Sequence, residues 1–199
     1  MTRSFCWARP DLEKRRVCPS ILLRTPHSDG FTEVPQYIVE SGLASTCTIA
    51  ISQPRRVAAT SLAARVAQEQ GSPLGQFVGF SVRFNEATSP ATRIKYLTDG
   101  MLARERLADP LLRRYGVVIV DEAHERTLNT DLVLAGLRGV QRERRRLWEE
   151  ANKITGSVHT KEKSNGKGKG KADDEVLPLK VVIMSATLDA EKFSRYFDK

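Results

Sequence analysis

The sequence contains little cysteine and no long apolar run. Cys6, Cys18 and Cys47 are the only cysteines among its 199 residues, and they form no CxxC pair. An odd, scattered set of cysteines argues against a disulfide framework or a zinc site and favours a reducing intracellular compartment. No apolar stretch approaches the ~20 residues of a membrane-spanning helix, and the N-terminal residues lack the apolar core of a secretory signal. These absences predict a protein that does not associate with membranes.

The excess of positive charge is concentrated in one segment. The net charge is +8, and residues 142–171 alone carry ten Lys and Arg against four Glu. Gly and Lys dominate from Glu149 to Glu175, and such a composition buries too little apolar surface to offset the entropy of an ordered chain. We therefore predict a disordered insertion over Glu149–Glu175. The alternative is a basic tract that binds RNA or directs the protein to the nucleus.

Outside this insertion, short apolar runs alternate with helical patterns. The predicted strands are Thr48–Ile51, Val117–Val120 and Val181–Met184, with weaker candidates at Val78–Val82 and Arg93–Leu97. The predicted helices are Asn129–Trp148 and Pro54–Gln70, the latter ending at Gly71 and placing Val57, Ser61, Ala64 and Val66 on one face. Runs that are apolar at nearly every position are typical of parallel strands buried on both faces. The sequence therefore predicts an α/β fold, a mostly parallel sheet with helices on both faces.

Two acidic residues directly follow one of these strands. Asp121 and Glu122 come after Val117–Val120, and ligands of parallel sheets bind beyond the carboxyl ends of the strands. In this pattern the first carboxylate faces a Mg²⁺ ion on nucleotide phosphates, and the second orients or deprotonates an attacking water. His124-Glu125 begins like the zinc-protease HExxH pattern, but Leu128 replaces its second histidine. The residues favour a nucleotide-hydrolysing site, and they leave open whether His124 belongs to it or caps a loop.

The stretch VVIVDEAHER, residues 117–126, resembles motif II of the DEAH-box helicases. Five further segments resemble family segments in the same order. PQYIVESG (35–42) resembles the helix after the phosphate-binding loop, and SQPRRVAAT (52–60) resembles motif Ia. VGFSVRF (78–84) resembles the strand between motifs Ia and Ib, TDGML (98–102) resembles motif Ib, and SAT (185–187) resembles motif III. The resemblance covers residues 32–197 apart from the insertion. It implies the first RecA-like domain, with a P-loop NTPase fold, of an ATP-dependent RNA helicase.

The resemblance also implies a role for each matching residue. Asp121 and Glu122 would hold Mg²⁺ through water, and Glu122 would activate the hydrolytic water. The remaining assignments are Thr32, Ser185 and Thr187 at the nucleotide, His124, Ser185 and Thr187 in coupling hydrolysis to domain movement, and Arg55, Arg56, Thr98 and Asp99 at the RNA strand. From the residues alone, Arg55 and Arg56 are as well explained as an exposed pair on the first turn of a helix.

The resemblance further implies the cofactors ATP and Mg²⁺, RNA as partner, possible protein activators, and a nuclear or nucleolar location, otherwise a cytoplasmic one. The nucleolar expectation comes from LGQFVGFSVRF (74–84), which resembles a ribosome-biogenesis branch of the family.

The phosphate-binding loop departs from the family pattern. The family has GxxGxGK[ST]T where this chain has RTPHSDGFT, residues 24–32, so Gly30 replaces the lysine and Phe31 the Mg²⁺-binding hydroxyl. Hydrogen bonds to charged groups contribute ~1.5–3 kcal/mol each, so losing two lowers nucleotide affinity by about 10²–10⁴. Residues 1–31 form an atypical segment without family likeness, in which Ser20–Leu23 is at best a short strand. Two functions stay open: the ATP-binding half of an RNA helicase, or an inactive module that binds RNA or a protein partner.

Overall fold

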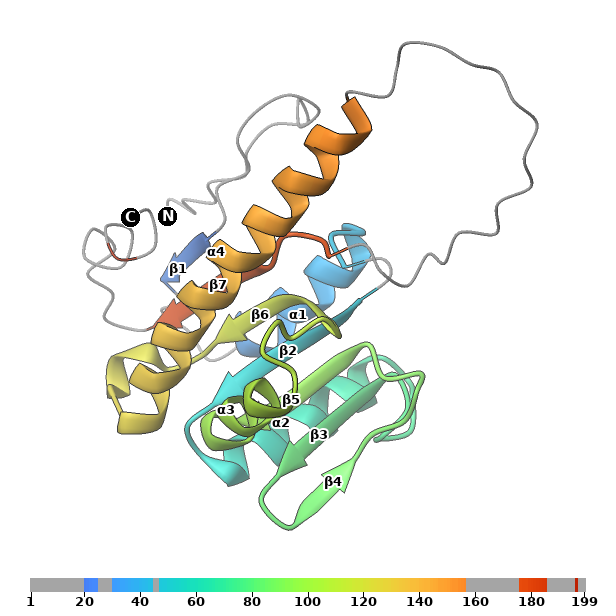
Figure 1. Ribbon diagram of the computed structural model, residues 1–199. Helices are drawn as coiled ribbons and strands as arrows, with labels where there is room; N and C mark the ends of the chain where they lie inside the picture. Colours follow the sequence, from blue (N-terminus) through green and yellow to red (C-terminus); the bar gives the residue numbers. More distant parts are fainter. Residues whose placement is uncertain (1–19, 25–29, 45–46, 157–175, 186–195, 197–199) are drawn as a thin grey trace, which may run out of the picture.

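The computed structural model describes residues 20–24, 30–44, 47–156, 176–185 and 196, and within them the chain forms one twisted sheet flanked by helices (Figure 1). The described strands are β1 (Ser20–Arg24), β2 (Thr48–Gln53), β3 (Val78–Val82), β4 (Asn85–Ala87), β5 (Ile94–Thr98), β6 (Tyr115–Val120) and β7 (Lys180–Ser185). The described helices are α1 (Gly30–Glu40), α2 (Arg56–Glu69), α3 (Asp99–Ala108), the 3₁₀ turn η1 (Ala123–Glu125) and α4 (Leu128–Gly156). Each strand that the sequence predicts is present.

In this part of the chain the sheet has seven strands in the order β1-β7-β6-β2-β5-β3-β4. Every neighbouring pair is parallel except β3 with β4. The carboxyl ends of the parallel strands therefore meet at one edge of the sheet, which is where parallel α/β sheets bind their ligands. The predicted α/β class with a mostly parallel sheet is confirmed.

The sheet separates two hydrophobic cores, because alternate residues of each strand point to opposite faces. Ile49 and Ile51 of β2 pack in the core that also contains α1 and α2 residues, whereas Ala50 packs in the core that contains α3 and α4 residues. Strands β6 and β7 divide in the same way. In Figure 1, α4 crosses in front of β7 and β6. Helices thus cover both faces, as predicted, and no described helix is long and apolar enough to cross a bilayer.

The predicted inner face of α2 is wrong except for one residue. Val57 is 78% exposed, Ser61 and Ala64 are also exposed, and only Val66 of that set is buried. The buried residues are Ala59, Ala63, Val66 and Ala67. Alanine is only weakly hydrophobic, so its positions do not stand out in the sequence, and the predicted face was placed around the larger Val57 instead. The small side chains let α2 lie directly on β3 and β5.

Helix α4 continues past Trp148 to Gly156, so the predicted insertion begins too early. Arg146 pairs with Glu143 at 2.5 Å and with Glu150 at 2.9 Å, one turn away on either side. Ion pairs at these spacings support an exposed helix without burying apolar surface, which explains why a charge-rich stretch is helical. The rest of the predicted insertion, residues 157–175, lies outside the described residues.

A buried arginine fixes the chain on both sides of that segment. Arg144 of α4 is 1% exposed, and its guanidinium donates to the carbonyls of Leu177 at 2.6 Å, Tyr115 at 2.8 Å and Leu112 at 3.2 Å. Its acceptors are all carbonyls in these bonds, and burial lowers the pKa of the guanidinium. Arg144 thereby ties α4 to the start of β6 and to the residues that lead into β7.

Strand β1 and helix α1 flank the segment where the family has its phosphate-binding loop. Strand β1 pairs in parallel with β7, with Arg24 opposite Ser185, and helix α1 begins at Gly30. The short strand predicted at Ser20–Leu23 is therefore confirmed. The connection between them, residues 25–29, lies outside the described residues.

Candidate functional site

Asp121 follows β6 and is fully buried. Its carboxylate accepts a hydrogen bond from the side-chain amide of Gln53, at the end of β2, and another from the backbone N–H of Glu122 at 2.8 Å. Burial raises the pKa of the Asp121 carboxyl to about 8, against the hydrogen bonds from Glu122 and Gln53, which lower it. A divalent cation reverses such a shift because it favours the charged carboxylate. The site fits a residue that carries its charge beside a metal ion.

A strained turn places the next residues. Glu122 has φ 50° and Arg126 has φ 48°, and the 3₁₀ turn η1 lies between them. Left-handed backbone at residues other than glycine is uncommon and clusters at functional sites. The turn leaves the side chains of Glu122 and His124 partly exposed, at 29% and 30%. Glu122 thereby faces solvent while its neighbour Asp121 is held inside.

His124 joins the turn to the end of β7. Its Nδ1 lies 3.3 Å from Glu122 Oε2 and 3.2 Å from Ser185 Oγ. The structure therefore brings Asp121, Glu122, His124 and Ser185 together at the carboxyl edge of the sheet. These contacts connect His124 to the motif III strand, which the sequence left undecided. Thr187 lies outside the described residues.

Thr32 stands in the first turn of α1, and its side chain is buried. Its backbone carbonyl accepts a hydrogen bond from the Gln36 side chain at 2.9 Å. Arg24 pairs with Ser185. The chain therefore enters residues 25–29 at the same edge of the sheet as residues 121–125, the DEAH sequence and the end of η1, which we call the DEAH turn. The described residues contain no cluster of three or more His, Cys, Asp or Glu able to hold a metal on their own.

The predicted RNA-binding arginines lie at the start of α2. Arg55 is the N-cap residue and makes no side-chain cap. It is 74% exposed and pairs through Nη2 with Glu125 Oε1 at 2.9 Å, whereas Arg56 donates to the carbonyl of Arg83 at 3.0 Å. Thr98 is the N-cap of α3, at the end of the neighbouring strand β5. Arg55, Arg56 and Thr98 thus follow the ends of two neighbouring strands at one edge of the sheet, although α2 and α3 pack on opposite faces.

Asp99, the fourth residue that the resemblance assigns to the RNA strand, has a side chain that points into the protein. It is 2% exposed. Its carboxylate accepts hydrogen bonds from the Ser52 hydroxyl and from the Thr130 hydroxyl at 2.5 Å. The TDG pattern locates Asp99 beside Thr98 but does not show that the first residue of α3 is turned inward. Asp99 instead joins β2, α3 and α4.

The sequence analysis also missed Ser52 and Gln53, which hold Asp99 and Asp121. Both are polar residues at the end of an otherwise apolar strand, directly before Pro54. A buried polar side chain requires a hydrogen-bond partner. Two consecutive polar residues at the end of a buried strand therefore indicate acidic partners at the ends of the neighbouring strands.

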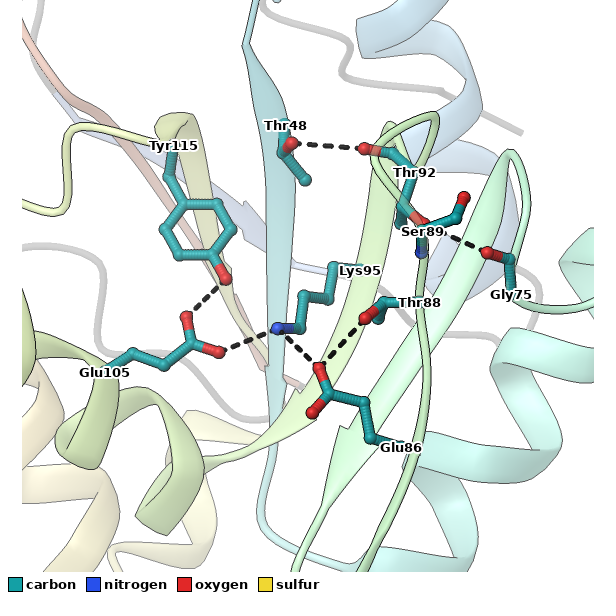
Figure 2. Close-up of polar contacts among 9 residues, drawn as sticks. All are labelled: Thr48, Gly75, Glu86, Thr88, Ser89, Thr92, Lys95, Glu105 and Tyr115. Atoms are coloured by element: carbon teal, nitrogen blue, oxygen red, sulfur yellow. Dashed lines mark hydrogen bonds and ion pairs between the residues drawn. The ribbon is translucent and has the colours of Figure 1, made fainter.

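A partly buried ionic network around Lys95 ties α3 to the sheet (Figure 2). Lys95 of β5 has a side chain 5% exposed, and its Nζ lies 2.8 Å from Glu105 Oε1 in α3 and 3.3 Å from Glu86 Oε1 in β4. The Tyr115 hydroxyl donates to the other oxygen of Glu105. Burial, followed by the charge of Glu105, raises the pKa of this hydroxyl. The network fixes α3, and with it Thr98, against the sheet.

No family model matches the chain, but curated proteins do. It is 44% identical over 184 residues to the human ATP-dependent RNA helicase DHX33. This match covers 92% of the chain and 22% of the relative. It is 46% identical over 176 residues to the Arabidopsis thaliana pre-mRNA-splicing factor ATP-dependent RNA helicase DEAH10, covering 83% of this chain and 24% of the relative. The human probable ATP-dependent RNA helicase DHX35 is 41% identical over 170 residues.

The parallel α/β sheet and these relatives together define the class: a RecA-like domain of a helicase. The chain belongs to the DEAH-box ATP-dependent RNA helicases. It spans between a fifth and a quarter of the length of the relatives it matches. The match to the human DHX33 protein covers 92% of the chain, more than residues 32–199 supply. The alignment therefore spans part of residues 1–31, for which the motifs predict no family likeness.

Proposed function

We propose that the chain is the ATP-binding half of a DEAH-box RNA helicase, in which ATP hydrolysis drives unwinding or remodelling of RNA. The observation that carries this proposal is His124, whose Nδ1 lies within 3.3 Å of both Glu122 and Ser185. The contact joins the hydrolytic turn to the strand of motif III. Such a link is needed if a change at the nucleotide is to reach another domain.

The residues divide the work according to their surroundings. Mg²⁺, when bound with ATP, neutralises charge on the phosphates. Buried Asp121 would bind that ion through water, with its carboxylate oriented by Gln53 and Glu122. Exposed Glu122 would orient the attacking water and accept its proton. His124 and Ser185, with Thr187, would transmit the change to a second RecA-like domain.

The phosphate loop is the part that does not fit ATP. Thr32 retains a hydroxyl, but Gly30 and Phe31 supply neither the cation nor the second hydroxyl that phosphates and Mg²⁺ need. This favours a second candidate function for the chain itself, a module that binds RNA or a protein partner without hydrolysing ATP. The family activity and the local chemistry disagree at these two residues.

The RNA face would be formed by Arg55, Arg56 and Thr98. Arginine and the N–H groups of helix starts bind phosphate without reading base sequence. Asp99 would act indirectly, by fixing α3. Protein activators are a further expectation, and a nuclear location is proposed because one relative is named as a pre-mRNA-splicing factor.

The two functions are separated by titrating a fluorescent ATP analogue with Mg²⁺. The unmodified chain should bind weakly and show negligible RNA-stimulated hydrolysis, unchanged by Glu122→Gln. Replacing residues 24–32 with GETGSGKTT should restore nucleotide binding, by about 10²–10⁴ in affinity. Clear turnover by the unmodified chain, abolished by Glu122→Gln, would show that the loop chemistry has been misjudged.

A further inference from the structure

We propose that Glu125 is a positioning residue that holds Arg55 until an RNA phosphate displaces it, so that RNA occupancy is coupled to the turn carrying Glu122 and His124. This inference rests on the proposed RNA face. It deepens that proposal by naming an internal competitor for the phosphate and the route from RNA to the hydrolytic turn.

The first observation is the geometry of the pair. Glu125 Oε1 accepts from Arg55 Nε at 3.1 Å and lies 2.9 Å from its Nη2. The Arg55 side chain is 74% exposed and that of Glu125 24% exposed, so an incoming anion can reach the guanidinium. Arg56, the adjacent residue, is held by the carbonyl of Arg83. Of the two arginines, Arg55 is the one held by a carboxylate.

The second observation is the position of Arg55. It is the N-cap residue of α2, and no side chain caps that helix start. A phosphate that arrives there meets both unpaired backbone N–H groups and the guanidinium fork. The fork offers the same donors to phosphate and to carboxylate. Phosphate and Glu125 therefore compete for Arg55.

The third observation is what Glu125 belongs to. It ends the turn η1, and its backbone N–H donates to the carbonyl of Glu122 at 2.9 Å. His124 lies between these two residues and contacts Ser185. Arg126, the next residue, pairs with Asp131 of α4 at 2.8 Å. The turn is thus held on one side by α2 through Arg55 and on the other by α4, and RNA would release the first hold.

RNA affinity tests the competition. Anisotropy of a labelled single-stranded oligouridine should show Glu125→Gln binding about two- to fivefold more tightly, the range expected for releasing an exposed ion pair. Removing any negative charge raises affinity for RNA, so Asp131→Asn serves as the matched control and should have less effect. The gain of Glu125→Gln should also vanish in an Arg55→Gln background, because nothing is then left to release. Melting curves of the variants check that each one folds.

The coupling has its own readout in the imidazole of His124. Its ¹⁵N signals, assigned by comparison with His124→Gln, should move when RNA is added to the unmodified chain and should be displaced already in Glu125→Gln. An equal gain of Glu125→Gln in both Arg55 backgrounds, or unmoved His124 signals on RNA binding, would overturn the inference alone. If no variant binds RNA, the proposed RNA face is wrong as well.

Discussion

The side-chain amide of Gln53 donates a hydrogen bond to the carboxylate of Asp121, which joins the ends of β2 and β6. These strands are neighbours in the sheet, with Ser52 opposite Val120. The contact connects the strand that leads to Arg55 and Arg56 with the strand that leads to Glu122 and His124. Burial raises the pKa of the Asp121 carboxyl, and this amide is one of two hydrogen-bond donors that oppose the rise.

Asp121 should make the chain less stable as the pH rises. Its folded-state pKa is raised from 3.8 to about 8, so its contribution to stability is present below the unfolded value and is lost between these two values. In thermal melts without divalent cations, Asp121→Asn should melt several degrees higher than the unmodified chain at pH 8 and nearly equally at pH 4. Gln53→Leu should extend the loss to higher pH, because removing a donor to the carboxylate raises its folded-state pKa further. A pH-independent difference between Asp121→Asn and the unmodified chain would contradict this account.

Replacing Lys95 with Met should destabilise the fold strongly. The substitution keeps the aliphatic stem but leaves Glu105, 26% exposed, and Glu86, 51% exposed, without the cation that both contact. Hydrogen bonds to charged groups contribute about 1.5–3 kcal/mol. Chemical denaturation measures the loss. Arg146→Met is the matched control, because Arg146 also contacts two carboxylates, but at an exposed surface. The control should change the midpoint of unfolding little; equal effects of the two variants would argue against the network.

RNA binding should be steeply salt-sensitive and independent of sequence, since phosphate contacts would dominate it. Reversing the charge of Arg55 and Arg56 together should weaken binding to oligouridine and to a mixed sequence by the same factor. Asp99→Asn should act differently, by lowering the melting temperature, because Asp99 is buried between two hydroxyl donors. Strong preference for one base sequence would exclude a face that tracks the backbone.

Replacing residues 157–174 with a short Gly-Ser linker should leave the melting temperature nearly unchanged. Their composition favours chain entropy over burial, and closure entropy changes slowly with loop length. Arg144→Met should lower it sharply, because the guanidinium binds carbonyls on both sides of the segment. A large loss on replacing the segment would mean that it contributes packed structure.

The positions of strands and motifs could be predicted from the sequence, because apolar runs and the DEAH pattern are local signals. The sequence did not reveal which way individual side chains point. The inner face of α2 is built from alanines, and Asp99 differs from its neighbour Thr98 only in where its side chain points. Lys95 could not be found by pattern, since its partners come from β4 and α3 and a single lysine in a strand carries no signal of burial.

The last strand of the sheet, β4, has a consequence for self-association. It is three residues long, it runs antiparallel to β3, and Glu86 at its centre is half exposed while bound to Lys95. An open parallel edge offers a row of unpaired backbone groups to a second chain, whereas a short, charged edge strand offers too little to extend. Among the described residues, the sheet thus ends on this side in a form that discourages edge-to-edge aggregation, and the same lysine that contacts α3 holds that edge in place.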